Sequence, residues 1–273
     1  MTGIIKILPL IILFLFQDNT PKSDYSLMKH INNKGNFITV DELGSLFLVN
    51  GEQLKKFDIN GRLLCTYSNL FNGNISFVDA GDPFKILVYY RDFSQIVFLD
   101  NFLSESAEAI LLETLGLELS TLACSSYNSG FWVYMPQNFE LLRVGQDMVI
   151  SHRSGDISSI IKNELNPNFL IEKDNVVYLN DPDIGIIMFD MYGTYNKIIP
   201  LKNLENLQLE GNNIISSSDT DMRIYNLKTS KETLSSLPED DPICVNLKYS
   251  FHPKRLFLLS ESGINIYAVD LDQ

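Results

Sequence analysis

The sequence has few of the residues that mark redox or metal chemistry. It contains three cysteines and three histidines, which are Cys65, Cys124, Cys244, His30, His152 and His252. None of the cysteines has a CxxC or CxxCH spacing, and no histidine belongs to an HExxH motif. Three cysteines cannot all pair within one chain, and each lies in an apolar run where a free thiol packs as a small hydrophobe. The sequence therefore predicts no metal site and no cofactor.

Positive charge is also scarce. The chain carries 21 Lys and Arg against 34 Asp and Glu, a formal net charge of −13. Such a surface repels phosphate and cannot gain affinity by releasing counterions from a nucleic acid, so nucleic acid is excluded as an expected partner. Motifs of common enzymes are missing as well, since the sequence has no GxSxG elbow, P-loop or strand-linked GxGxxG.

Only one long hydrophobic run is present, at residues 7–16 near the N-terminus, with Lys6 before it and polar residues 17–20 after it. Ten to thirteen apolar residues are too few to span a bilayer comfortably and match a secretion signal. We expect residues 1–20 to be a signal peptide or an N-terminal hydrophobic anchor of a periplasmic or secreted protein. Bulky Phe14 to Phe16 leave the cleavage position open. No other membrane contact is expected, and residues 21–273 read as one domain.

The rest of the chain is repetitive. Six copies of a paired apolar pattern occur at intervals of 36–47 residues, each ending in a large residue: Phe57, Phe98, Leu142, Phe189, Tyr225 and Tyr267. The runs are rich in Val, Ile, Leu, Phe and Tyr and are separated by clusters of Asn, Asp, Gly, Ser and Pro, which is typical of strands joined by tight turns. A further apolar run precedes each pair and another follows it, as at residues 62–67 and 194–199.

Four strands per repeat at this period predict an all-β, six-bladed β-propeller with four-stranded blades. After Tyr267 too few residues remain for a fourth strand in the last copy. A strand-like run at 25–31 precedes the first copy, so we expect it to complete the last blade and close the ring. The longest insertion, at 104–119, has the apolar spacing of one short amphipathic helix ended by Gly116.

A local motif, aromatic-Asp-x-x-Gly, occurs as Phe57-Asp58-Ile59-Asn60-Gly61 and as Phe189-Asp190-Met191-Tyr192-Gly193. With this motif residues 36–273 resemble the six-bladed propellers of the NHL and TolB-like type and exported bacterial propellers of unassigned function. The resemblance implies a fold and carries no activity with it.

Candidate binding residues come from the turns between the second and third strands of each repeat, which open on one face of the ring. Five of the six turns hold a carboxylate: Glu52, Asp92, Asp181, Asp183, Asp219, Asp221 and Glu261. Together they could attract a cation or a basic partner segment. The alternative is ordinary turn chemistry, because tight turns select Asp, Asn, Ser and Gly.

Aromatic residues gather in the third repeat. Trp132 and Tyr134 alternate with Phe131 and Val133 along one strand, so we expect the two pairs to pack on opposite sides of the blade. Tyr127 falls in the preceding turn, on the face opposite to the acidic turns.

Two functions fit these observations. The first is a non-enzymatic binding or scaffold module of the cell envelope, whose partner is an unknown protein, peptide or small ligand. The second is a hydrolase or lyase with Asp181, Asp183 and Asp219 at the mouth of the axial channel. Propellers assemble active sites from several blades, so the lack of a linear motif does not separate the two.

Overall fold

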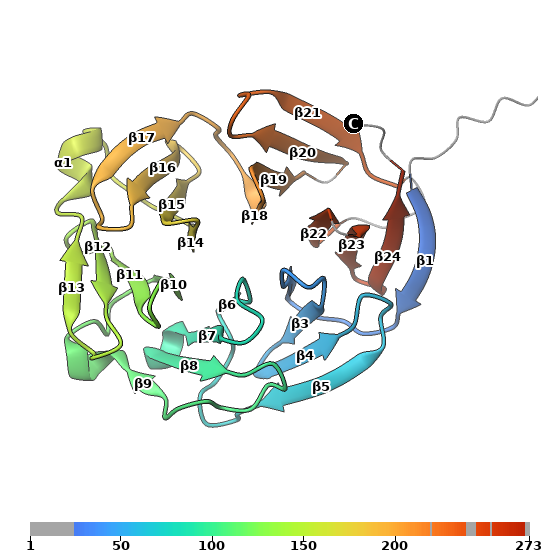
Figure 1. Ribbon diagram of the computed structural model, residues 1–273, viewed down its shortest axis with the longest axis horizontal. Helices are drawn as coiled ribbons and strands as arrows, with labels where there is room; N and C mark the ends of the chain where they lie inside the picture. The colour runs from blue at the N-terminus through green and yellow to red at the C-terminus, as the bar shows by residue number, and fades with distance from the viewer. Residues whose placement is uncertain (1–24, 219, 239–243, 252, 271–273) are drawn as a thin grey trace, which may run out of the picture.

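The computed structural model describes residues 25–218, 220–238, 244–251 and 253–270, and the expected signal or anchor at 1–20 lies outside them. The described strands form six antiparallel four-stranded sheets arranged as blades around a central axis (Figure 1). The predicted six-bladed β-propeller is confirmed.

The strands of each blade are called A to D from the axis outward. Blade one contains β2 (Phe37–Val40), β3 (Leu46–Asn50), β4 (Gln53–Phe57) and β5 (Leu63–Ser68). Blade two contains β6 (Phe77–Asp79), β7 (Ile86–Tyr90), β8 (Gln95–Leu99) and β9 (Ile110–Leu111). Blade three contains β10 (Leu122–Ser125), β11 (Phe131–Met135), β12 (Glu140–Val144) and β13 (Ile150–Arg153).

Blade four contains β14 (Phe169–Lys173), β15 (Val176–Asp181), β16 (Gly185–Asp190) and β17 (Tyr195–Ile199). Blade five contains β18 (Glu205–Glu210), β19 (Asn213–Ser217), β20 (Asp221–Asn226) and β21 (Glu232–Ser236). Blade six contains β22 (Asn246–Phe251), β23 (Lys254–Ser260), β24 (Gly263–Val269) and β1 (Tyr25–Ile31).

The ring closes as expected at the two ends of the chain. Strand β1 is the D strand of blade six and pairs antiparallel with β24, from Tyr25 opposite Val269 to Ile31 opposite Ile264. The first and last described strands thus lie in one sheet. Their hydrogen bonds close the ring at blade six, where no covalent connection joins the two ends.

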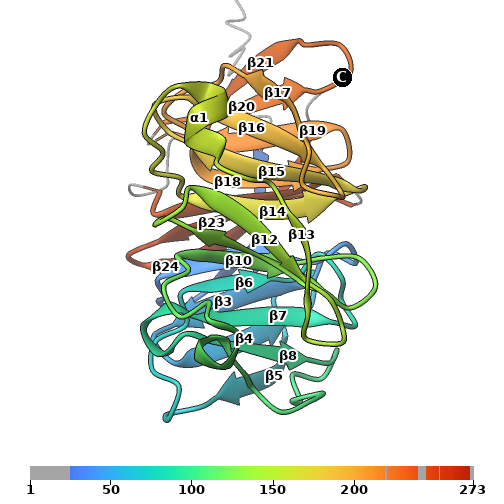
Figure 2. The same ribbon diagram turned by 90° about the vertical axis from the view of Figure 1, so that its left-hand side faces the viewer.

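The helical segments are short. They are the α-helix α1 (Ile157–Ile161) and the 3₁₀ helices η1 (Arg91–Phe93) and η2 (Leu112–Leu115). Figure 2 shows the ring from its edge, with α1 and β13 at the periphery. Among the described residues no helix has the length and apolar character needed to cross a membrane.

The insertion at 104–119 differs from the expected amphipathic helix. Its middle forms β9, in which Ile110 pairs with Ile96, because blade two needs a fourth strand to cover its outer edge. The helical part is only the single turn η2, which ends at Gly116 with φ +69°, so the predicted stop is confirmed.

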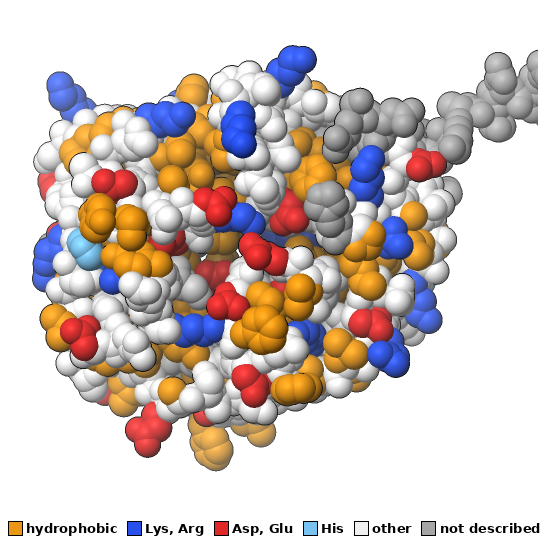
Figure 3. Space-filling view, in the orientation of Figure 1, with side chains coloured by type: hydrophobic (Ala, Val, Ile, Leu, Met, Phe, Trp, Pro, Cys, Tyr) orange, Lys and Arg blue, Asp and Glu red, His pale blue; other side chains and the backbone are white. Residues whose placement is uncertain are grey.

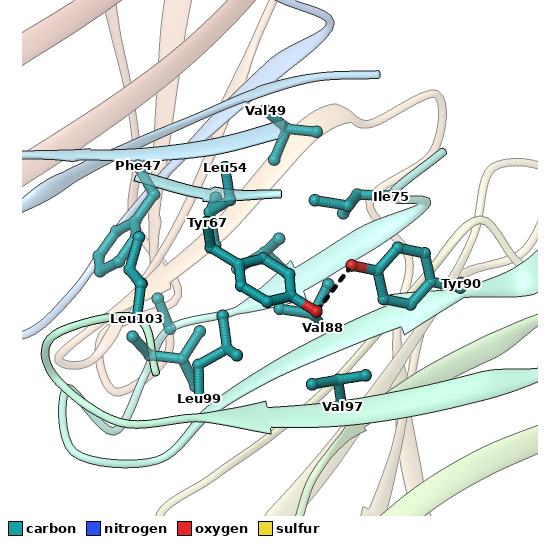
Figure 4. Close-up of a cluster of buried hydrophobic side chains, with 13 residues drawn as sticks. Phe47, Val49, Leu54, Tyr67, Ile75, Val88, Tyr90, Val97, Leu99 and Leu103 are labelled. Atoms are coloured by element: carbon teal, nitrogen blue, oxygen red, sulfur yellow. Dashed lines mark hydrogen bonds between the residues drawn. The ribbon is translucent and has the colours of Figure 1, made fainter. Parts of the chain in front are cut away.

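The apolar core is divided among the gaps between blades. Six buried clusters each draw on two adjacent blades, and Figure 4 shows the cluster between blades one and two. That cluster contains Phe47 and Leu54 of blade one together with Val88 and Tyr90 of blade two, and the Tyr90 hydroxyl donates to that of Tyr67 at 3.4 Å. Burying an apolar side chain such as Leu54 or Val88 contributes about 1.5–3 kcal/mol to the free energy of folding.

Blade three confirms the predicted alternation. Phe131 and Val133 pack in the cluster shared with blade two, whereas Trp132 and Tyr134 pack in the cluster shared with blade four. Since the blades pack against one another side by side, the axis itself is left without an apolar core.

The aromatic-Asp-x-x-Gly motif forms the turn between the C and D strands. The carboxylate of Asp58 accepts two backbone amides at 3.0 and 2.9 Å, and Gly61 supplies φ +77°. Asp190 makes the same turn in blade four. Blade two repeats it with Asp100, where Leu103 takes φ +61° in place of glycine. The turn is therefore more widespread than the motif.

Candidate functional site in the axial cavity

The predicted acidic turns lie on the face that carries the B–C turns and the connections between blades, here called the B–C face. Their described carboxylates occupy the β3–β4 turn, η1, the β15–β16 turn, the start of β20 and the β23–β24 turn: Glu52, Asp92, Asp181, Asp183, Asp221 and Glu261. None of these six lines the axial cavity. Asp219 lies outside the described residues. Binding by this face stays a prediction.

Asp181 has a structural task within its turn. Asp181 is only 1% exposed, and its Oδ1 accepts the backbone amides of Asp183 and Ile184 at 3.0 and 3.3 Å. Its Oδ2 accepts the amide of Asn166 at 2.7 Å, which fixes the segment entering blade four. Both carboxylate oxygens are thus used by the backbone, as in other Asx turns.

A large hollow lies on the axis. It has a volume of about 740 Å³ and is lined by residues of all six A strands and by several A–B turns. Figure 3 shows acidic side chains gathered around this central hollow. The lining includes seven carboxylates and two lysines: Asp41, Glu42, Asp79, Asp82, Glu172, Asp174, Glu210, Lys173 and Lys248. The carboxylates belong to the A strands and the A–B turns, on the side of the ring opposite to the B–C face.

One ion pair links opposite blades at this cavity. Lys173, at the end of β14 in blade four, places its Nζ 3.4 Å from Oε1 of Glu42 in the A–B turn of blade one. The Glu42 side chain is 62% exposed and that of Lys173 20% exposed, so the pair lies at the outer part of the cavity.

Polar side chains satisfy the free backbone edges of the A strands. An A strand has a partner on one side only, so half of its amides and carbonyls face the axis without a strand to bind them. The Asp79 Oδ2 accepts the amide of Ser125 at 2.9 Å, and the Asn246 Oδ1 accepts the amide of Ile38 at 3.2 Å. Each bond joins adjacent blades, and the wall of the cavity is therefore fixed.

Burial raises the pKa of Asp79, while the backbone amides of Gly81 and Ser125 act in the opposite direction. Asp79 is only 5% exposed, and its two carboxylate oxygens accept the backbone amides of Gly81 and Ser125. Asp79 is therefore part of the wall and contributes less negative field than the exposed carboxylates at the same cavity.

Glu172 connects the cavity with blade three. Its Oε2 accepts the indole N–H of Trp132 at 2.7 Å and also accepts the hydroxyl of Ser126. Ser126 in turn accepts Nε of Arg143 at 2.8 Å, and the guanidinium of Arg143 lies 3.7 Å from the ring centre of Tyr127. The predicted core position of Trp132 is confirmed, and its polar edge in addition orients a lining carboxylate.

Lys248 is a lysine of the cavity lining that is buried and bonded to backbone carbonyls. It lies on β22, is 8% exposed, and its Nζ donates to the carbonyls of Leu207 at 3.0 Å and Asn206 at 3.4 Å. Burial lowers the pKa of Lys248 to about 8, while nearby Cys244 acts in the opposite direction. Within the described part of the chain, none of its neighbours at ion-pair distance is a carboxylate.

The described cysteines and histidines are spread over several blades. Cys124 is buried, Cys65 and Cys244 are partly buried, and none of the three forms a disulfide within the described chain. His30 bonds Asn265 within blade six, His152 lies against Tyr192, and His252 is outside the described residues. The parts of the chain that are described hold no cluster of three or more His, Cys, Asp or Glu side chains suited to a metal ion.

Sequence comparison finds no matching family model and no matching curated protein. Solved structures do match in shape. The chain is similar to the WD40 domain of Neurospora crassa Pan2, with 8% identity and a TM-score of 0.64 over 91% of this chain and 96% of that one.

It is also similar to a streptogramin B lyase, with 9% identity and a TM-score of 0.59 over 90% and 97% of the two chains. A third match is the extracellular domain of a putative one-component system from B. thetaiotaomicron. There the identity is 11% and the TM-score 0.55, over 88% of this chain and 34% of the other. At these identities the likeness establishes the propeller fold alone.

Proposed function

We propose that this propeller is an exported, non-enzymatic binding module that holds a small ligand in its axial cavity. The observation that carries the proposal is a hollow of about 740 Å³ into which all six blades contribute polar groups. That volume falls within the range of about 300–1,000 Å³ typical of ligand pockets.

The rigidity of the wall supports the same function. Asp79, Asn246 and Glu172 are held by hydrogen bonds that cross from one blade to the next. A ligand entering such a cavity meets groups that are already fixed, so it loses less binding energy to ordering the protein.

The alternative of a hydrolase or lyase has less support. It depended on Asp181, Asp183 and Asp219 gathering at the channel mouth, but Asp181 and Asp183 are not in the cavity lining. The Ser126 hydroxyl donates to Glu172 in this lining, but Glu172 also accepts the indole N–H of Trp132 and Ser126 accepts Nε of Arg143, so both groups are held in wall contacts. We therefore favour binding without chemistry.

The experiment is a screen of small metabolites by thermal shift and native mass spectrometry. Thr39 lines the cavity from β2, so Thr39→Trp fills part of it. Thr66 is exposed on β5, the outermost strand of the same blade, and Thr66→Trp is the matched control. We expect a ligand of the wild type to be lost by Thr39→Trp and kept by Thr66→Trp. The proposal fails when no compound binds or when both variants bind alike.

Export rests on residues 1–20 alone and has its own test. A reporter that is active only outside the cytoplasm is fused after the propeller, with and without deletion of residues 2–20. Reporter activity that persists after the deletion contradicts export through this segment.

A further inference from the structure

Two lysines of the described chain are almost fully withdrawn from solvent, and their surroundings differ. Lys56 is 2% exposed and lies 3.6 Å from Oδ2 of Asp41, with the side-chain and backbone oxygens of Asn101 also in contact. Lys248 is 8% exposed, and among the described residues its Nζ bonds backbone carbonyls and has no carboxylate at ion-pair distance. A buried cation without a counter-ion is costly, because the carbonyl dipoles replace only part of its hydration.

The buried charge of Lys248 lies at the wall of the axial cavity, where a ligand can reach it. Lys248 lines the axial cavity, whereas Lys56 does not. The neighbours of Lys248 are fixed, since the Asn246 amide donates to Oδ1 of Asn206 at 2.6 Å and the Gln208 amide is bound on both sides by Tyr249. An anionic group of a ligand would provide the counter-charge that the described residues do not supply.

The remaining lining selects against a simple anion. Apart from Lys248 it contains one lysine and seven carboxylates, so its net field is negative. A ligand that carries a carboxylate for Lys248 and an ammonium for the acidic wall matches both features. Apolar contact is available too, because Phe77 and Phe169 also line the cavity and pack edge to face with ring centres 6.0 Å apart.

We propose that Lys248 binds the carboxylate of a zwitterionic ligand of the amino-acid type, whose ammonium faces the carboxylates of the same cavity. This inference rests on the proposed function, in that it requires the axial cavity to bind a ligand. It goes further by naming the ligand class and the residue that recognises one end of it.

The test measures binding by calorimetry of L-phenylalanine, then of the remaining natural amino acids at millimolar concentration. L-phenylalaninamide lacks the carboxylate and 3-phenylpropanoate lacks the ammonium. We expect L-phenylalanine to bind the wild type and both analogues to bind at least about 10-fold more weakly, the usual effect of losing one charged hydrogen bond. Absence of binding by every amino acid overturns the inference, and so does an analogue that binds as tightly as L-phenylalanine.

Variants of the two lysines separate recognition from folding. Lys248→Met is expected to weaken L-phenylalanine binding about 10- to 100-fold and to melt at or above the wild-type temperature. Lys56→Met, the matched control, leaves Asp41 buried without its partner and is expected to melt lower. Lys248→Arg keeps the charge and is expected to keep measurable binding. A Lys248→Met protein with unchanged affinity contradicts the assignment.

The outcomes also separate this inference from the proposed function. A ligand without a carboxylate or an amine that binds the wild type and is lost in Thr39→Trp would leave the cavity as the binding site and refute the amino-acid assignment. Failure of every compound in the metabolite screen, together with the amino acids, would refute both.

Discussion

The side chain of Gln208 binds both backbone groups of Tyr249 across the gap between blades five and six. Its Nε2 donates to the Tyr249 carbonyl at 2.7 Å and its Oε1 accepts the Tyr249 amide at 2.8 Å. One amide side chain therefore serves as a short substitute for a neighbouring strand at the free edge of β22. The bonds are buried, so no water replaces them when the side chain is removed.

Gln208→Leu is expected to lower the free energy of unfolding by about 1–3 kcal/mol, because a buried amide and carbonyl lose their partners. Chemical denaturation measures the loss. Gln146 is exposed in the C–D turn of blade three, and Gln146→Leu is expected to change stability by less than about 0.5 kcal/mol. Equal effects of the two substitutions would contradict the role given to Gln208.

The seam of the ring depends on β1. Deletion of residues 21–35 removes the D strand of blade six and exposes the edge of β24, so we expect a lower melting temperature for the whole domain. A truncated protein that melts like the intact one would refute the closure.

A point substitution tests the same strand more gently. Ile31 is 7% exposed and packs in the cluster between blades six and one, so Ile31→Ala is expected to cost about 2–5 kcal/mol. Met28 on the same strand is 46% exposed, and Met28→Ala is expected to cost less than about 0.5 kcal/mol. Denaturant titration of both variants provides the comparison.

The protonation of Lys248 predicts a specific pH dependence. Its pKa is about 8 in the folded chain and 10.5 as its ordinary value. Between these two pH values the folded state binds fewer protons than the unfolded state. The free energy of unfolding therefore rises with pH in this range, because the cost of burying the charged lysine is lost. Below pH 8 the penalty is fully present, on the order of 3 kcal/mol.

The measurement is the difference in unfolding free energy between Lys248→Met and the wild type at several pH values. We expect the variant to be the more stable at pH 7 and its advantage to shrink toward pH 10.5. Taking the difference removes the titration of tyrosines and cysteines common to both proteins. An advantage that does not depend on pH would show that Lys248 has its ordinary pKa in the folded chain.

The bond between Trp132 and Glu172 makes the single tryptophan a reporter of the cavity wall. Glu172→Gln keeps the size of the side chain but replaces a charged acceptor by a neutral one, about half as strong. We expect a change in Trp132 emission with a stability loss of about 1 kcal/mol. Exposed Glu113 provides the control Glu113→Gln. Identical spectra for the two variants would argue against the contact.

Much of the fold was predictable because its information is local and repeated. The alternation of Phe131 and Val133 with Trp132 and Tyr134 predicts two packing faces, and these side chains do occupy two separate clusters. The apolar spacing of 104–119 predicts an amphipathic helix, and this prediction is wrong apart from the single turn η2. Its strand β9 is only two residues long, and it exists because β8 offers an edge to pair with, which a pattern of apolar residues does not reveal.

The cavity was less accessible to sequence reasoning. Glu172 and Lys248 come from different repeats and share no spacing, so only the closure of the ring brings them to one axis. A faint signal existed for Lys248, a charged residue within the apolar run Leu247-Lys248-Tyr249. The carboxylates in the B–C turns drew attention because turns favour them, and Asp181 shows that one of them serves the backbone.

The Lys173–Glu42 ion pair connects the blades in a different way from the apolar core. The apolar clusters connect each blade only to its neighbours, so they hold the ring together around its circumference. This ion pair instead joins blades one and four across the diameter, like a spoke. Salt screens such a partly exposed pair far more than it affects apolar contacts. Added salt is therefore expected to weaken this contact across the ring while the apolar contacts between neighbouring blades are kept.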